Sequence, residues 1–398
     1  MLNSINNLSL LNKLVGTSLT PPPDYKALVC ILLAGGNDSF NMLVPRGSSE
    51  YAEYAATRAD LAIPQGDLLP INPLTTGGGK LFGVHPSMAG VQALFEQGKA
   101  AFLANAGTLI EPVANATEYF SGDKDLPLGL YSHSDQIQQW QTSIPQSREA
   151  IGWGGRAADI LKSQNTNQGI SMNISLAGTN VWQSGNTISA YSISNDGNGV
   201  EGIQSAVPWW YSNAGYLTRV RDVAVESMAE QIYANVFKQT FGSLTNQSLD
   251  TFEEFENVMA ALPPFNTTFS SHYLSQDLKQ VARVIAGREA LGMCRQTFFT
   301  TFGGWDHHDG LIENQLVMLD VLSDAISEFM SALAEIGMQD KVTLFTVSDF
   351  ARTLTSNGQG SDHAWGGNAI MAGGALNGQE IYGSFPDLYL DDNPLIVS

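Results

Sequence analysis

The fold of this chain is decided by residues 342–374, which read VTLFTVSDFARTLTSNGQGSDHAWGGNAIMAGG. The apolar run at 342–347 is rich in β-branched and aromatic residues and predicts a buried strand. The chain then turns polar and presents Ser348, Asp349, Arg352, Asp362 and His363. In open α/β sheets, ligands bind outside the carboxyl ends of the strands. This stretch therefore predicts a strand of such a sheet and part of a functional site.

Two other segments repeat this order of an apolar strand followed by Gly and Asp. ALVCILLAGGND ends at Asp38, and RQTFFTTFGGWDHH ends with Asp306, His307 and His308. The carboxyl ends of parallel strands meet at one edge of a sheet, so we expect these acids to lie close together. Clustered carboxylates raise one another's pKa unless a cation lies between them. The recurrence therefore favours a divalent metal site.

Strand-like and helix-like runs alternate along the chain. Strands are expected near 27–34, 101–106, 295–301 and 342–347, and helices at 51–61, 85–101, 132–142, 152–162, 216–262, 274–291 and 312–336. This alternation predicts an α/β fold with a doubly wound, mostly parallel central sheet. We expect one domain over 24–398, with a β-rich and helical cap insertion around 163–270. Residues 1–23 are expected to be a leader-like or disordered segment.

The composition excludes some classes of partner. The 398 residues include 39 acidic and 19 basic side chains, for a net charge of −20. No basic stripe is present to neutralise phosphates, so no nucleic-acid partner is expected. No run is long enough for a membrane-spanning helix. Cys30 and Cys294 are too few for a disulfide framework and are expected to be free thiols.

Asp306 and His308 stand two residues apart. In an extended segment both side chains point to one side and His307 to the other. An Asp-x-His pair can bind a metal, although alone it is also common in surface loops. Carboxylates with imidazoles suit Zn²⁺, Mn²⁺ or Ca²⁺. One such site is expected, with the candidate ligands Asp38, Asp306, His308, Asp349 and His363.

Two interpretations are open for Ser132. At a helix N-terminus near a metal it can act as a nucleophile, because the helix dipole favours its alkoxide. With Asp135 three residues on, it also fits an ordinary capping box. His133 is a candidate for contact with substrate or metal, or for capping the loop.

The arginines and the other histidines have less specific patterns. Arg352 and Arg156 are candidate oxyanion clamps, because a guanidinium matches phosphate or sulfate geometry, but each can equally pair with a carboxylate. His85 precedes a proline and is expected to be structural. His272 lies in a polar linker and is given no role.

A set of motifs in fixed order carries a resemblance: GGNDSFNMLVP, FGVHPSM, SHSDQIQQWQ, GWGGR, GGWDHH, SDFARTLTSNGQGSDHAWGG and MAGGALNGQEIYG. Together they resemble the bacterial domain-of-unknown-function family 1501, over about residue 24 to the end. That family is similar to a branch of the alkaline phosphatase and sulfatase superfamily. The resemblance implies a doubly wound sheet and a one- or two-metal site. Because members usually carry a twin-arginine leader, it also implies a periplasmic or extracellular protein.

The resemblance also implies roles for single residues. Asp38 resembles the first-strand ligand, Asp349 the acid of an Asp-His pair, and Asp306, His308 and His363 the remaining ligands. Phe350 stands where the superfamily usually has the His of that pair, so one well-held metal is expected. The sulfatase-type Cys/Ser-x-Pro-x-Arg motif is absent from the sequence. Only its position at the expected start of a helix therefore makes Ser132 a candidate nucleophile.

Two functions are expected from this resemblance. The first is an exported metal-dependent hydrolase of phosphate or sulfate esters, acting on a small-molecule or polysaccharide anionic ester. The alternative is a non-catalytic, secreted binding or assembly protein. The chain lacks paired arginines near its start and ends at Ser398, where the family is expected to continue into a last strand and helix. We therefore expect either a truncated copy or a last strand and helix that are supplied in another way.

Overall fold

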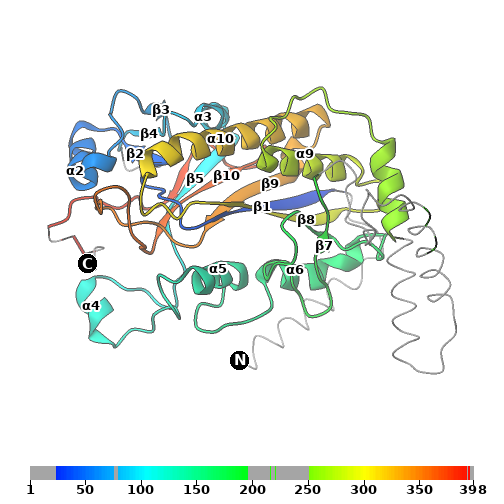
Figure 1. The fold of residues 1–398 in the computed structure, drawn as a ribbon, viewed down its shortest axis with the longest axis horizontal. Helices are drawn as coiled ribbons and strands as arrows, with labels where there is room; N and C mark the ends of the chain where they lie inside the picture. The colour runs from blue at the N-terminus through cyan, green and yellow to red at the C-terminus, as the bar shows by residue number, and fades with distance from the viewer. Residues whose placement is uncertain are drawn as a thin grey trace.

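The computed structural model describes residues 24–75, 79–195, 216, 220, 251–391, 393 and 394. Its centre is a sheet with the strand order β11-β5-β10-β9-β1-β8-β6-β7 (Figure 1). The strands are β1 (Lys26–Ala34), β5 (Ala100–Ala106), β6 (Asn173–Ser175), β7 (Tyr191–Ser192), β8 (Arg295–Gly303), β9 (Val342–Ser348), β10 (Gly367–Ala372) and β11 (Ile381–Gly383). Only the pairings of β10, with β5 and β9, are antiparallel in this sheet.

Strand β1 shows why the sheet is covered on both faces. Its odd-numbered residues Val29, Ile31 and Leu33 pack into the larger core cluster. The alternate residues Cys30 and Leu32 pack into a second cluster on the other face. A strand with apolar side chains in both directions must lie between two layers, which is typical of parallel sheets. The continuous apolar run in the sequence is thereby explained.

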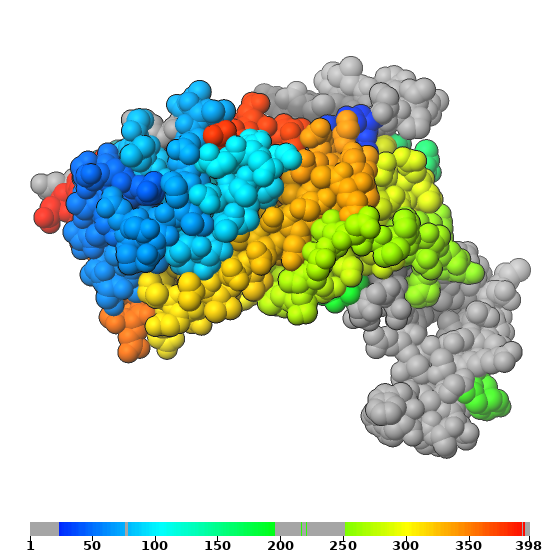
Figure 2. All heavy atoms as spheres, turned by 90° about the horizontal axis from the view of Figure 1, so that it is seen from above, coloured from blue at the N-terminus to red at the C-terminus, as the bar shows by residue number. Residues whose placement is uncertain are grey.

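Helices cover both faces of this sheet (Figure 1). One face carries α3 (Ala89–Glu96), α9 (Tyr273–Ala286) and α10 (Leu311–Glu335), and the other carries α5 (His133–Thr142) and α6 (Trp153–Leu161). Figure 2, seen from above, shows α10 running diagonally between the segment of α3 and that of α9, and α10 contacts both helices. The predicted doubly wound α/β fold is confirmed.

The chain outside these layers adds short elements. They are α2 (Ser48–Arg58), α4 (Ala116–Ser121), and a small sheet of β2 (Leu43–Pro45), β4 (Phe82–Val84) and β3 (Leu69–Ile71). None of the described helices is both long enough and apolar enough to cross a bilayer. Cys30 and Cys294 are both free, as expected.

All four predicted strands are present in the central sheet, and β1 pairs directly with β9. The helix expected from residue 85 is wrong at both ends, because α3 begins at Ala89 and residues 100 and 101 belong to β5. Ser87 does not cap it, since the Ser87 hydroxyl donates to the Leu316 carbonyl at 2.7 Å. The N-cap position of α3 is Met88, which makes no side-chain cap.

The segment 163–270 differs in part from the predicted cap. Its described strands β6 and β7 extend the edge of the central sheet, with Ile174 paired to Phe298, and do not lie over the sheet. Residues 251–261 are helical, as expected. Most of 196–250 lies outside the described residues, as does the expected leader at 1–23. The cap and the division into domains stay predictions.

His85 gives the fold a pH dependence. Its side chain is buried directly after β4, and Nδ1 accepts a hydrogen bond from the Ser87 N–H at 3.2 Å. Burial lowers the pKa of His85 to about 4, against 6.5 in the unfolded chain. Between these values the unfolded chain binds a proton that the folded chain does not, so stability is lost as the pH falls from about 6.5 to about 4.

We expect this histidine to account for up to about 3 kcal/mol of unfolding free energy over that range. Urea unfolding of the wild type and of His85→Asn at about pH 7 and about pH 4 measures it, because the neutral amide cannot take up the proton. The wild type should lose more stability than the variant on acidification. Equal losses in both proteins would contradict the assignment.

Candidate metal centre

The site begins where three parallel strands end side by side, because β1 pairs with both β8 and β9. Two glycines after β1 allow this close approach. Gly35 has φ +121°, and a Cβ there would lie 2.5 Å from the backbone nitrogen of Asp306. Gly36 has φ +81°, and a Cβ there would lie 2.4 Å from the Phe350 ring. The Gly-Gly pair therefore lets the three loops meet without steric conflict.

Four side chains from these loops and from the start of α5 converge: Asp306, His308, His363 and His133. The Asp306 Oδ1 atom lies 3.1 Å from His308 Nε2 and 3.3 Å from His363 Nε2. The two Nε2 atoms are themselves 3.1 Å apart. His133 Nε2 lies 3.6 Å from the second oxygen of Asp306. All four side chains are partly exposed, from 25% to 46%.

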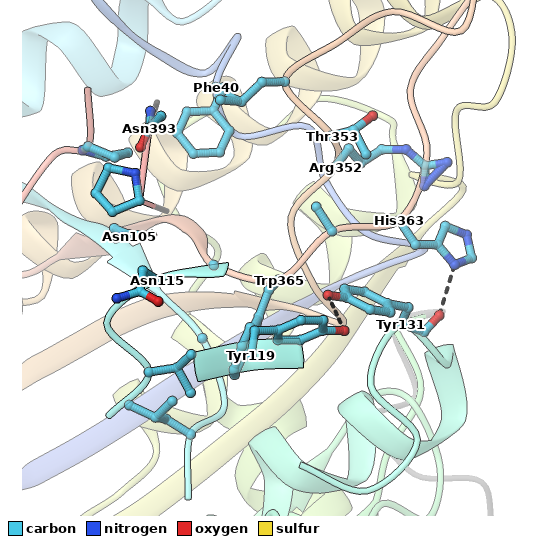
Figure 3. A pocket seen from close by; sticks show the side chains of 18 of the residues that line it. Phe40, Asn105, Asn115, Tyr119, Tyr131, Arg352, Thr353, His363, Trp365 and Asn393 are labelled. Atoms are coloured by element: carbon cyan, nitrogen blue, oxygen red, sulfur yellow. Dashed lines mark hydrogen bonds between the residues drawn. The ribbon is translucent and has the colours of Figure 1, made fainter. Parts of the chain in front are cut away.

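The other ring nitrogen of each histidine contacts an acceptor. The pairs are His133 Nδ1 with the Asp349 carboxylate (2.7 Å), His308 Nδ1 with the Asp362 carboxylate (3.0 Å), and His363 Nδ1 with the Tyr131 carbonyl (2.9 Å; Figure 3). A carboxylate or carbonyl oxygen accepts, so Nδ1 carries the proton in each ring. A neutral ring then presents a lone pair at Nε2, as in metal-binding histidines.

This arrangement fits a divalent cation. With these tautomers, two imidazole lone pairs and a carboxylate oxygen face one another at 3.1–3.3 Å. Three acceptors at this separation are unfavourable unless a cation or a shared proton lies among them. Ligands bound tetrahedrally at about 2.0–2.1 Å lie about 3.3 Å from one another, which matches the observed spacing. Ligand atoms of His133, Asp306 and His363 also fall within 4.8 Å of one another.

Phe350, which replaces the expected histidine, packs against the cluster. Its ring is buried and lies 4.8 Å from the His133 ring and 4.4 Å from the His363 ring, between centroids. It contributes no ligand atom, but its contact with both rings limits their rotation. Phe350 thus packs against two of the histidine rings of the cluster.

Arg352 holds the carboxylate of the cluster. Its guanidinium is fully buried and donates from both terminal nitrogens to Asp306 Oδ1, at 2.9 and 2.8 Å. Its Nε donates to the Ser361 carbonyl at 3.0 Å. Burial lowers the pKa of Arg352, while the charges of Asp306 and Asp38 act in the opposite direction. The role expected for Arg352, that of an oxyanion clamp, is therefore not supported, because its N–H groups already donate hydrogen bonds to Asp306 and Ser361.

Asp38 lies outside the cluster, in a buried ion pair with Arg58. Its Oδ2 also accepts a hydrogen bond from the Ser361 hydroxyl at 3.0 Å. Arg58 donates in addition to the Asn41 side chain and to the Thr353 carbonyl. The Arg58 guanidinium thus compensates one oxygen of this carboxylate, while the other, Oδ1, is buried without a hydrogen-bond partner.

Asp349 contacts the His133 ring on the side away from Asp306. Its carboxylate accepts from the His133 ring at 2.7 Å and from the Gly35 N–H at 3.1 Å. Burial raises the pKa of Asp349, and these two hydrogen bonds offset part of the rise. His133, a candidate for contact with substrate or metal, therefore faces the cluster with its Nε2 atom, and Asp349, a candidate ligand, contacts the far side of its ring. The other Asp349 oxygen, Oδ1, is buried without a hydrogen-bond partner.

Ser132 and Arg156 make other contacts than those expected. Ser132 precedes α5 but makes no side-chain cap, so the capping-box prediction is wrong, and its hydroxyl lies 3.3 Å from that of Ser134. Arg156 donates to the carbonyls of Thr142 and Ile151. A guanidinium at the last residue of α5 stabilises that helix end and is not available to a substrate.

A family model described as "Protein of unknown function (DUF1501)" matches residues 25–397. This chain belongs to the DUF1501 family. The match includes every residue of the cluster, and no curated protein matches the chain.

Solved structures resemble this DUF1501 protein only weakly. One is i-CgsB in complex with neocarrahexaose, at 9% identity and a TM-score of 0.33, covering 91% of this chain and 68% of that chain. Another is a 2-O GAG sulfatase, at 8% identity and a TM-score of 0.29, covering 90% of this chain and 66% of that chain. Likenesses at this level carry no information on the reaction of the DUF1501 protein.

Several residues that hold the site had no role in the sequence-based prediction. Asp362 was visible as a polar neighbour of His363, and this adjacency was the available signal. No signal in the sequence pointed to Arg58 or to the Tyr131 carbonyl, because the residues that they contact are distant in the sequence. Tyr131 has φ +71°, an uncommon conformation for a bulky residue that points its carbonyl at His363.

The Asp349→Asn protein is expected to bind metal about 10–100-fold more weakly, as is typical when the outer partner of a ligand is lost. The amide oxygen can still accept from the His133 ring and from the Gly35 N–H, but it lacks the negative charge that raises the basicity of the His133 ring. Competition with a chromogenic chelator measures the affinity. Asp135→Asn is the matched control, because Asp135 lies on the same helix but pairs with the exposed Arg148. Equal affinity of both variants would contradict this role.

Proposed function

We propose that this DUF1501 protein is an exported, metal-dependent hydrolase of phosphate or sulfate esters. The observation that carries the proposal is the convergence of three imidazole Nε2 atoms on the Asp306 carboxylate, with each Nδ1 held by an acceptor. The choice of these esters and of export rests on the family resemblance.

The donor set favours a particular kind of ion. Three nitrogen ligands suit Zn²⁺ or Mn²⁺ better than Ca²⁺, which prefers oxygen. When bound, such an ion polarises an ester oxygen and lowers the pKa of a nucleophile. One ion is proposed, because Phe350 supplies no ligand atom where the superfamily usually has a histidine.

Residues of the chain itself favour an anionic ester beside the cluster. His133 is the first residue of α5, so the N-terminus of this ten-residue helix lies at the site. The partial positive charge of a helix N-terminus stabilises a bound anion. The exposure of Asp306 and His308, 46% each, leaves the site open for substrate to enter.

Hydrolysis of para-nitrophenyl phosphate and para-nitrophenyl sulfate tests the proposal. The purified protein should turn over at least one of them, lose this activity to a chelator, and regain it with Zn²⁺ or Mn²⁺. The Ser132→Ala variant then tests the proposed nucleophile, since its loss of activity would support Ser132 and retention would assign a water. A protein with stoichiometric metal and no turnover of either ester would count against hydrolysis.

A non-catalytic binding or assembly protein is the second candidate. It is favoured by the guanidinium of Arg352, which occupies Asp306 Oδ1, and by the Ser132 hydroxyl, which contacts Ser134. Metal analysis separates the two candidates, because a protein that binds no divalent ion cannot carry out the proposed chemistry. Export is tested independently by cell fractionation of the native host.

A further inference from the structure

A cavity of about 620 Å³ opens directly beside the cluster. His363 and Arg352 line it as well as belonging to the site, and Figure 3 shows both at its edge. Its volume lies within the range of about 300–1,000 Å³ that is typical of small-molecule sites. The cavity is therefore positioned to hold the part of a substrate that carries the ester.

Aromatic side chains form much of its wall: Phe40, Tyr119, Phe120, Tyr131 and Trp365. Trp365 is fixed in place, because its Nε1 donates to the Thr108 carbonyl at 2.6 Å. The Tyr119 ring lies 6.3 Å from the Trp365 ring, and the Tyr119 and Tyr131 hydroxyls are 3.1 Å apart. These rings present a rigid apolar surface with hydroxyl groups at its edge (Figure 3).

The polar groups of the wall are mostly uncharged. They are the side chains of Asn105, Asn115, Thr108, Thr353 and Thr355, with Asn393. Among the described residues that line the cavity, only Arg352 and Asp387 are charged. Arg352 is bonded to Asp306, and Asp387 is paired with Lys80 at 2.8 Å. A ligand in the cavity therefore meets amides, hydroxyls and rings, and no free cation of these lining residues.

Three classes of ligand can be compared on this basis. A polysulfated chain needs several cations, which the lining lacks, and the net charge of −20 opposes it. A purely apolar ligand would make no hydrogen bond to the Tyr119 and Tyr131 hydroxyls or to the Asn105 amide, which line the cavity. A sugar ring has apolar faces and a polar edge, so it satisfies both the aromatic rings and the uncharged polar groups.

We infer that the cavity binds an uncharged sugar ring, so that the substrate is a saccharide with a single phosphate or sulfate ester placed at the cluster. This inference rests on the proposed function for the ester. Tyr131 joins the two parts, since its carbonyl accepts from the metal-site His363 and its side chain lines the cavity. The sugar is thus bound next to the metal ligands.

Calorimetric titration of the purified full chain with uncharged oligosaccharides tests the inference without catalysis. The probes are maltohexaose, cellohexaose, xylohexaose and mannohexaose, with heparin as the polysulfated comparison. The wild type should bind at least one uncharged probe more tightly than heparin. Trp365→Ala should weaken that binding at least about tenfold, because the stacking surface is lost. Trp365→Phe, which keeps a ring, should show a smaller loss.

Tyr273→Ala is the matched control, because Tyr273 is a partly exposed aromatic on α9 that does not line the cavity. It should bind the probes like the wild type. Binding of heparin alone, no binding of any uncharged probe, or equal binding by wild type and Trp365→Ala would each overturn the inference. Turnover of para-nitrophenyl esters without saccharide binding would overturn this inference alone. Saccharide binding without ester turnover would support the cavity assignment and overturn the hydrolase.

Discussion

The Asp306→Asn protein is expected to bind Zn²⁺ or Mn²⁺ more than about 100-fold more weakly than the wild type, which exceeds the loss expected for an outer partner. The carboxylate is the only anion among the four converging side chains, and His308 and His363 both face its Oδ1 atom. The amide of the variant is neutral, so it no longer balances the positive charge of a bound metal ion. Metal content by mass spectrometry and competition with a chelator measure the loss, and ester hydrolysis should fall with it.

This substitution also leaves the buried Arg352 without its anion, so it can lower stability as well. His308→Gln is the second variant, because it removes a ligand and leaves the Arg352–Asp306 pair in place. It should lose metal while keeping the urea midpoint of the metal-free wild type, with both proteins unfolded in the presence of a chelator. His272→Asn is the control, since His272 caps α9 through its Nδ1 and Asn is a good cap. Wild-type metal content in both Asp306→Asn and His308→Gln would refute the centre.

The Arg58→Ala protein is expected to lose about 3–5 kcal/mol of unfolding free energy. Both side chains of the Arg58–Asp38 pair are fully buried, so the variant leaves an unpaired carboxylate away from water. It also removes the donor to the Thr353 carbonyl, 295 residues along the chain. Urea unfolding followed by circular dichroism measures the change.

Arg148→Ala is the matched control for this pair. Arg148 is 66% exposed and pairs with Asp135, and such surface pairs contribute about 0–1 kcal/mol. The double variant Arg58→Leu with Asp38→Asn should recover part of the loss, because no buried charge remains. A loss for Arg58→Ala no larger than that for Arg148→Ala would show that the pair contributes little.

Four strands of the central sheet, β1, β5, β8 and β9, were predictable because each is a local pattern. Val29, Ile31 and Leu33 face one layer and Cys30 and Leu32 face the other, so the run is apolar in both directions. The strand-end glycines were equally visible. The start of α3 was not, because Ser87 bonds to a carbonyl of α10 and not to the helix that follows it. The strands β6 and β7 are too short to show a periodicity of their own.

The candidate site was predictable only in part. The Asp-x-His spacing puts Asp306 and His308 on one side, and His307 is buried on the other. His363 was predictable for a similar reason, because it follows a strand that ends at the same edge of the sheet. The different partners of Asp38 and Asp349 were not predictable, because the sequence around a strand-end carboxylate is the same whether that carboxylate contacts a metal, an arginine or a histidine.

The amino-acid sequence by itself determined the α/β fold class, the positions of the main strands and the edge at which acids and histidines gather. These depend on hydrophobic periodicity and on glycine positions, which are local properties of the chain. The tertiary structure alone decided which groups compensate which charges. Asp38 meets Arg58, Asp349 meets His133, and Arg352 meets Asp306 across long separations in sequence. Such pairings depend on distances set by the packed layers, because electrostatic contacts act through space and leave no periodic pattern along the chain.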